Sequence, residues 1–187
     1  VAFHGVNHTG RTLGVVNEYL SLQAQIDLGP AGQGPNGVAV MPDSGRVVAA
    51  NRQTANASVV DPAAGTVVQT IAANLLPNGV LIAGDYGYIA NYGSDTVTAF
   101  DPATLAVIRT LHGVGHEPAL FAADHESGDV FLTAHGSNQV FYLHDGQVIG
   151  QWNGISAPYG ISYDPAGRRL YVANRGPAQT VTVIDVY

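Results

Sequence analysis

The stretch that decides the fold is GPNGVAVMPDSGRVVAAN (34–51), because the chain repeats it three more times in altered form. The variants are LPNGVLIAGDYGYIAN (76–91), EPALFAADHESGDVFLTAH (117–135) and APYGISYDPAGRRLYVAN (157–174). The landmark prolines of the four copies are Pro35, Pro77, Pro118 and Pro158, which gives spacings of 42, 41 and 40 residues. A fixed period of this length is typical of repeat architectures.

Within each copy the apolar residues alternate with period two, as they do in β-strands. Val38 and Val40 alternate, residues 42–45 carry turn chemistry, and residues 47–50 run apolar up to Asn51. This pattern predicts a hairpin of two inner strands. A third strand is predicted where Thr and Val alternate, and a fourth before the next landmark proline. The third strands are expected at 57–60, 96–100 and 180–184, and the fourth at 66–71 and 105–111.

Four antiparallel strands in a unit of about forty residues match the blade of a β-propeller. A β-sandwich is the competing architecture, but it predicts no repetition of whole units. We therefore predict an all-β protein, a single β-propeller domain (1–187) of about five four-stranded antiparallel blades. The repeat units are 1–34, 35–76, 77–117, 118–157 and 158–187.

The two terminal units depart from the template, which predicts an incomplete ring in this chain. Asn17 to Pro35 spans 18 residues, whereas Asn51 to Pro77 spans 26, so the first unit has an abbreviated or missing outer strand. The last unit stops where its third strand would lead into a fourth. We therefore expect either that the chain is a fragment, or that a second chain or a second copy of this one is a partner that completes the propeller.

Composition narrows the classes of function. The net charge of −7 comes from 14 acidic residues against 7 basic ones, all of them Arg, which argues against a nucleic-acid partner. The absence of Cys excludes disulfides and thiolate metal sites. No apolar run approaches the ~18 residues of a membrane span. Because the chain begins without Met or a signal core, we expect an exported protein, secreted, cell-surface or periplasmic, whose signal is not in this chain.

The template resembles the YVTN-type propeller repeat over nearly the whole chain. The motif is spelled Val-Ala-Ala-Asn at 48–51, Ile-Ala-Asn at 89–91 and Tyr-Val-Ala-Asn at 171–174. The stretch 10–18 also looks like a blade of the related seven-bladed lactonase-like propellers. The resemblance implies a propeller fold but not one activity, because that family holds surface proteins, redox-enzyme subunits and lactonases. No catalytic position of the lactonases could be matched to a residue here, so the catalytic residues stay unknown.

Two series of polar residues are expected on one face of the propeller. In a blade, the loop before the first strand and the loop after the second lie on the same side, so both series border the central channel. The alternative interpretation is that the Asn side chains stabilise turns, since Asn bonds local backbone readily. The loops before the inner strands supply Asn36, Asn78, Glu117 and Tyr159, and the loops after the second strands supply Asn17, Asn51, Asn91, His135 and Asn174.

The fourth repeat unit and the loop that leads into it carry five of the seven histidines, at 112, 116, 125, 135 and 144. Imidazole suits several divalent transition metals, so His116, Glu117 and His135 are candidate ligands and a divalent metal is a candidate cofactor. The alternative is that these are exposed loop histidines without a ligand. His125 lies in a turn on the opposite face, so the five histidines cannot form one site.

Three functions remain open from the sequence. The first is an exported binding or interaction module that presents its polar rim and channel to a small-molecule or protein ligand. The second is a lactonase-like hydrolase, although no nucleophile elbow or nucleotide-binding fingerprint is present. The third is a metal-binding or redox propeller that uses the histidines of the fourth unit.

Overall fold

The computed structural model describes residues 2–3, 10–19, 21–177 and 179–187. This part of the chain is all-β, and its strands form five antiparallel sheets that follow one another along the chain. We call these sheets blades one to five.

The strands of the first two blades are β1 (Ala2–Phe3), β2 (Thr12–Val16) and β3 (Leu22–Asp27), then β4 (Pro35–Val40), β5 (Val47–Asn51), β6 (Asn56–Asp61) and β7 (Thr66–Ala72). Blade three holds β8 (Pro77–Ala83), β9 (Tyr86–Asn91), β10 (Thr96–Phe100) and β11 (Val107–Leu111). Blade four holds β12 (Pro118–Asp124), β13 (Asp129–Ala134), β14 (Gln139–His144) and β15 (Gln147–Asn153). Blade five holds β16 (Pro158–Asp164), β17 (Arg169–Asn174) and β18 (Val181–Asp185).

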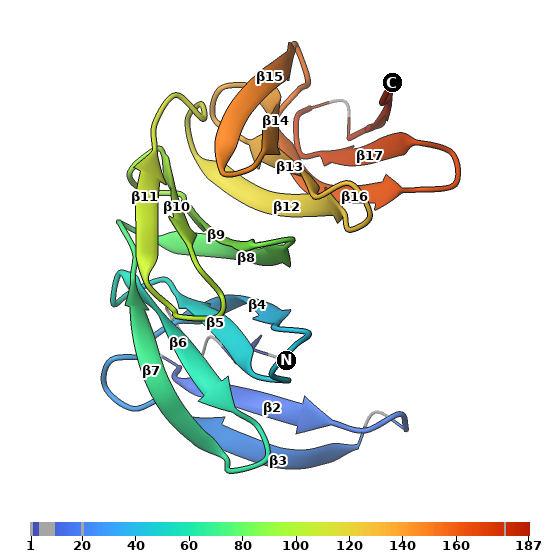
Figure 1. Ribbon diagram of the computed structural model, residues 1–187. Helices are drawn as coiled ribbons and strands as arrows, with labels where there is room; N and C mark the ends of the chain where they lie inside the picture. Colours follow the sequence, from blue (N-terminus) through green and yellow to red (C-terminus); the bar gives the residue numbers. More distant parts are fainter. Residues whose placement is uncertain (1, 4–9, 20, 178) are drawn as a thin grey trace.

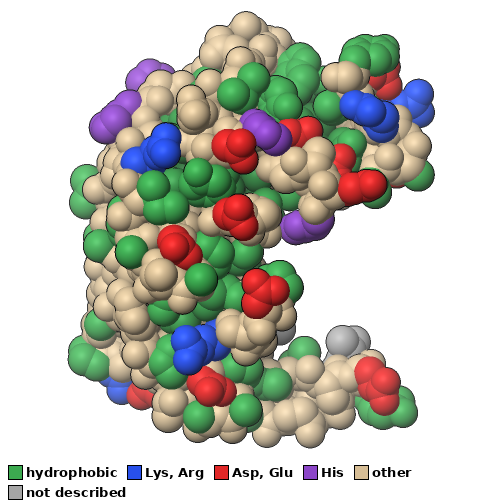
Figure 2. Space-filling view, viewed as in Figure 1, with side chains coloured by type: hydrophobic (Ala, Val, Ile, Leu, Met, Phe, Trp, Pro, Cys, Tyr) green, Lys and Arg blue, Asp and Glu red, His purple; other side chains and the backbone are tan. Residues whose placement is uncertain are grey.

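The blades stand side by side in an arc that is open on one side (Figure 1). The inner strands β4, β8, β12 and β16 pack against one another along the concave side, while β7 and β11 lie on the convex side. The space-filling view shows the same C shape with a wide notch (Figure 2). The predicted β-propeller with an incomplete ring is therefore confirmed for the described residues.

Three of the five sheets have the four strands that the repeat predicts, and the first and last have three among the described residues. In blade one the outer strand is the missing one, which agrees with the short spacing between Asn17 and Pro35. In blade five the third strand, β18, is the last. The complete middle blades and the shortened first blade thus follow from the spacing of landmarks along the chain.

Apolar side chains on alternate positions hold neighbouring blades together, because successive residues of a strand point to opposite faces. On β9, Ile89 packs into the core shared with blade two, which contains Val48 and Val59. Tyr88 and Ala90 face the other way, into the core shared with blade four. Each middle blade is therefore buried on both faces.

The inner strands approach so closely that two of them require glycine. A Cβ on Gly37 would lie 2.4 Å from the backbone oxygen of Asn78, and a Cβ on Gly79 would lie 2.5 Å from the backbone oxygen of Ala119. Real Cβ atoms do not reach such distances, so the Pro-Asn-Gly segments allow the backbones of adjacent blades to meet beside the channel. This contact sets the position of the Asn that precedes each glycine.

Candidate functional site

The channel inside the arc has two ends of different chemistry. Each inner strand begins at its landmark proline, so the proline ends of β4, β8, β12 and β16 gather at one mouth. The hairpin turns that follow these strands gather at the opposite mouth. The two series of polar residues expected from the sequence belong to the first mouth.

Three Asn residues of this mouth are buried and used within their own blades. Asn91 donates through Nδ2 to Thr96 Oγ1 at 3.1 Å and to Thr98 Oγ1 at 3.0 Å. Asn51 and Asn174 make the equivalent bonds to polar side chains of β6 and to two Thr residues in blade five. Asn17 accepts the backbone N–H groups of two residues in its own loop. These four side chains therefore stabilise loops and strand pairs in this structure.

Strand pairing shifts blade four by one residue from the alignment expected from the sequence. Pro77 pairs with Asn91, whereas Pro118 pairs with Ala134. His135 therefore does not occupy the Asn position of its blade, and the expectation that it does was wrong. Counting sixteen residues from the landmark proline, the distance from Pro35 to Asn51, would have identified Ala134 from the sequence.

The residues that do project at this mouth come one position later. Because the buried Asn points into the blade, its successor points the other way. The backbone N–H of each successor donates to the residue that precedes a landmark proline, which shows that the four positions are equivalent. The four successors are Arg52, Tyr92, His135 and Arg175, and of these only His135 was among the residues singled out from the sequence.

A cavity of about 480 Å³ lies between these side chains and the ends of the inner strands. Its lining comes from blades two to five. We call it the arginine mouth, and its lining residues are Asn36, Gly37, Arg52, Asn78, Tyr92, Leu120, Tyr159 and Arg175. Three of them, Asn36, Asn78 and Tyr159, were expected at the rim from the sequence.

Each arginine of this mouth lies against a tyrosine ring of another part of the lining. The Cζ of Arg175 lies 3.3 Å from the centroid of the Tyr159 ring, and the Cζ of Arg52 lies 5.0 Å from that of Tyr92. Such cation–π contacts restrict where a guanidinium can point without neutralising it. Among the described residues neither arginine forms an ion pair.

Asn78 connects the blades beneath the arginines. It is 1% exposed, and its Nδ2 donates to the Ala119 oxygen at 3.1 Å and to the Tyr159 hydroxyl at 3.3 Å. Its Oδ1 accepts hydrogen bonds from the Asn36 amide and from Nη1 of Arg52. One amide therefore joins side chains and backbone from blades two to five, and it holds the floor of the mouth in one arrangement.

Glu117 lies beside this mouth with a different set of contacts. It precedes Pro118, so it is equivalent to Leu76 and not to Asn78, and its carboxylate lies over Gly136. The Tyr92 hydroxyl donates to that carboxylate, and burial together with this bond raises the pKa of Tyr92. Tyr92 therefore has a cation at its ring and an anion at its hydroxyl.

His116 pairs with a carboxylate and does not meet His135. Its Nδ1 lies 2.8 Å from Oδ2 of Asp95, and the other oxygen of Asp95 accepts the Glu117 backbone N–H at 2.8 Å. The hydrogen bond from the Glu117 N–H, and to a smaller extent the one with His116, lower the pKa of Asp95. In the part of the chain that the structure describes, no three His, Asp or Glu side chains are grouped to hold a metal ion. The candidate ligands His116, Glu117 and His135 are thus not assembled into a site.

His135 itself contacts Tyr159. Its ring meets the Tyr159 ring edge-on, with centroids 5.8 Å apart and an interplanar angle of 85°. The Nδ1 atom of His135 is buried and has no hydrogen-bond partner among the described residues. His135 therefore packs behind Tyr159, which lines the arginine mouth, and its side chain makes no polar contact there with the described residues.

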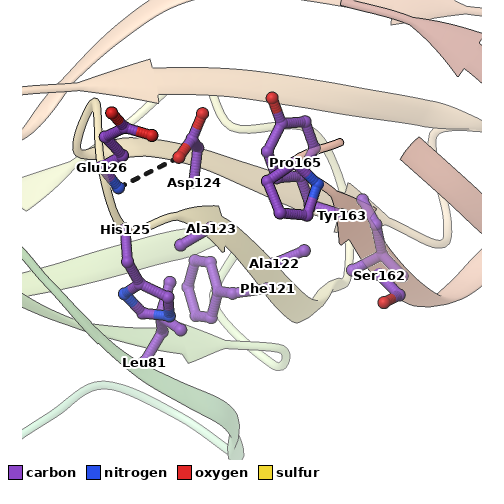
Figure 3. Close-up of a pocket in the computed structure, with 11 residues that line it drawn as sticks. Leu81, Phe121, Ala122, Ala123, Asp124, His125, Glu126, Ser162, Tyr163 and Pro165 are labelled. Carbon is purple, nitrogen blue, oxygen red and sulfur yellow. Dashed lines mark hydrogen bonds between the residues drawn. The ribbon is translucent and has the colours of Figure 1, made fainter. Parts of the chain in front are cut away.

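The opposite mouth holds a recess of about 550 Å³ between blades three, four and five (Figure 3). Leu81, Phe121 and Tyr163 give it apolar walls, and Asp124 and Glu126 stand on one hairpin turn at its edge. Burial acts to raise the pKa of Asp124, but hydrogen bonds from the Glu126 N–H and the Tyr163 hydroxyl outweigh it, so the pKa of Asp124 is lowered. The carboxylate is therefore used to stabilise its turn.

Comparisons with known proteins bear on the fold. No protein-family profile matches the chain, and no curated protein matches its sequence. Among solved structures it is similar to hydrazine synthase of Kuenenia stuttgartiensis, with a TM-score of 0.72 and 16% sequence identity. The match covers 95% of this chain and 72% of that one. At this identity the likeness supports the propeller fold and nothing about chemistry. The described part of the chain has no helix long and apolar enough to cross a membrane.

Proposed function

We propose that this protein is a ligand-binding propeller whose arginine mouth takes a small ligand with a carboxylate group. One observation supports it above the others. Arg52 and Arg175, without ion-pair partners among the described residues, line the same 480 Å³ cavity in a protein of net charge −7. Ligand cavities of roughly 300–1,000 Å³ with a few convergent polar groups are the usual form of a small-molecule site.

The chemistry of the lining favours a carboxylate over a neutral ligand. A guanidinium presents its donors in a planar fork that matches the two oxygens of a carboxylate. The stacked tyrosines hold Arg52 and Arg175 in place before the ligand arrives, so less side-chain freedom is lost on binding. The amides of Asn36 and Asn78 add neutral polar groups at the floor.

Isothermal titration calorimetry with phenylpropionate and its primary amide tests the proposal. The carboxylate is expected to bind and the amide to bind at least about tenfold more weakly, since bonds to charged groups are the stronger ones. Arg52→Gln and Arg175→Gln should each weaken the binding of phenylpropionate by about tenfold. Arg46→Gln is the matched control, because Arg46 lies in a hairpin turn at the opposite mouth. Equal binding of acid and amide, or unchanged binding in both mouth variants, would refute the proposal.

Membership of the YVTN-type family and export from the cytoplasm are further proposals. The recurring Ala-Asn motif at the end of β5, β9 and β17 supports the first. A profile built from new homologues that fails to align these motifs would count against it. Fractionation of cells that make the full gene product tests export.

A lactonase-like activity has one pair of residues in its favour. The Asp95 carboxylate can accept a hydrogen bond from Nδ1 of His116 and so orient the imidazole ring. The other ring nitrogen, Nε2, is then the acceptor that a general base requires. The pair lines a recess next to the arginine mouth together with Tyr92 and Glu117. Lactone hydrolysis that falls in His116→Gln but not in His125→Gln would support this alternative, and hydrolysis equal in both would exclude this pair.

A second chain that completes the propeller is supported by an uncovered face of blade five. Val181 and Val183 are 62% and 53% exposed, and Tyr171 is 40% exposed, on the face that points away from blade four. Phe131, at the equivalent position of blade four, is 0% exposed because blade five covers it. Sedimentation of the wild type and of Val183→Asp tests whether this face associates, and a monomer in both cases would contradict the proposal.

A further inference from the structure

We infer that the ligand of the arginine mouth is a small zwitterion, which places its carboxylate at Arg52 and Arg175 and an ammonium group at Glu117. This inference rests on the proposed function. It adds the second charge of the ligand and names the residue that recognises it.

Glu117 interrupts the pattern of its own position. The residue before the landmark proline is Gly34, Leu76 or Ala157 in the other three blades, so an acidic side chain occurs here in blade four alone among these four. In blade three, Leu76 lies against Gly93, and in blade four the Glu117 carboxylate lies against Gly136 in the same way. The position that packs an apolar side chain in blade three therefore carries a carboxylate at the edge of a cavity in blade four.

Tyr92 connects this carboxylate with the arginines. It lines both the arginine mouth and a second recess formed with Asp95, His116 and Glu117. The guanidinium of Arg52 lies over its ring, and its hydroxyl donates to Glu117. A single ligand that lies along Tyr92 would thus meet a cation at one end and an anion at the other.

The carboxylate of Glu117 keeps acceptor capacity for a ligand. A carboxylate offers about four lone-pair sites, and the Tyr92 hydroxyl uses one of them. Among the described residues Glu117 has no ion pair. Asp95 differs, because its two oxygens already accept from the His116 ring and the Glu117 N–H. Glu117 therefore keeps more acceptor capacity than Asp95, and it is the acidic group of this recess that we assign to the ammonium.

The two charges select against related ligands. A dicarboxylate would bring its second negative group to Glu117, and a simple amine would leave both arginines without a partner. A monocarboxylate would satisfy the arginines and gain nothing at Glu117. A molecule with an ammonium and a carboxylate a few bonds apart, the pattern of an amino acid, fits both ends.

Calorimetry with phenylalanine, phenylpropionate and phenethylamine tests the inference, because the three probes share one skeleton and differ only in their charged groups. We expect phenylalanine to bind about tenfold more tightly than phenylpropionate, and phenethylamine to bind most weakly. In Glu117→Gln the advantage of phenylalanine over phenylpropionate should disappear while phenylpropionate itself is retained. Glu126→Gln, which makes the same change at the opposite mouth, should leave all three affinities unaltered. Tyr92→Phe should reduce the advantage of phenylalanine in part.

The outcomes separate this inference from the proposed function. If phenylpropionate binds as tightly as phenylalanine to the wild type, the zwitterion is refuted and the carboxylate site stands. Tightest binding by phenethylamine, or an advantage of phenylalanine that persists in Glu117→Gln, also refutes it. If neither carboxylate binds, the proposed function fails and the inference fails with it.

Discussion

Replacement of Asn91 by Ala tests whether the repeated Asn holds the blade together. The Asn91 side chain is 0% exposed and makes three hydrogen bonds. Its Nδ2 donates to Thr96 and Thr98, and its Oδ1 accepts the backbone N–H of Asn74 at 3.1 Å. The last bond ties β9 to the segment that leads from blade two into blade three. The substitution therefore removes contacts within one blade and to the loop that enters it.

The expected loss follows from the number of bonds and from what they leave behind. A typical intramolecular hydrogen bond contributes about 0.5–1.5 kcal/mol, and a buried group left without a partner adds a desolvation cost. Three bonds with the Asn74 N–H left unpaired correspond to a loss of about 3 kcal/mol in the free energy of unfolding. In Asn51→Ala the loss should be smaller, about 2 kcal/mol, because Oδ1 of Asn51 has no partner to lose.

Urea unfolding followed by circular dichroism measures both variants against the wild type. We expect a lower urea midpoint for Asn91→Ala than for Asn51→Ala, and normal binding of phenylpropionate by folded Asn91→Ala. A loss below about 1 kcal/mol for Asn91→Ala, or the opposite order of the two variants, would refute the structural role. Loss of binding without loss of stability would instead give this Asn a place in the ligand site.

Three further substitutions, one of them with a control variant, probe other parts of the fold. Burial raises the pKa of Tyr88 to about 12, so its contribution to stability is full below its ordinary pKa of 10.0 and is lost as the pH rises through about 12. Tyr88→Phe should remove this alkaline loss in urea unfolding, yet cost about 1–3 kcal/mol at neutral pH because the Gly146 N–H loses its acceptor. Gly79→Ala should destabilise by about 1–3 kcal/mol in thermal melts, since the new Cβ would lie 2.5 Å from a backbone oxygen of β12. Gly150→Ala, with open space around it, is its control and should be neutral. Ala55→Asn should raise the urea midpoint, by up to about 1 kcal/mol in stability, because Ala55 has a φ of 50° that Asn adopts more easily.

Much of the fold could be predicted because its signals are local and repeated. Alternation predicts the strands, and the spacing of the landmark prolines predicts the blades. The short spacing between Asn17 and Pro35 predicts the shortened first blade. The strand order within a blade predicts Asn36, Asn78 and Tyr159 at one mouth, where the structure has them. Residue type alone aligns His135 with the Asn residues, whereas the strand pairing gives that position to Ala134, which pairs with Pro118.

The arginine mouth could not be assembled from the sequence. Arg52 and Arg175 stand next to buried Asn residues, and a shift of one position along a strand turns a side chain to the opposite face. Arg52 meets Tyr92 although the two are on different blades, so their contact depends on how the blades pack. No local pattern records such a contact.

By itself the sequence determined an acidic, cysteine-free, all-β chain of repeated hairpins, because composition and period-two alternation act within each unit of about forty residues. Only the tertiary structure decided which polar side chains are used inside a blade and which face the channel. The physical reason is that a blade satisfies its own buried amides, as Asn91 does, while the side chains of the mouth find their neighbours across blades. Asn78 does so with Tyr159 and Arg52, and Arg52 does so with the ring of Tyr92.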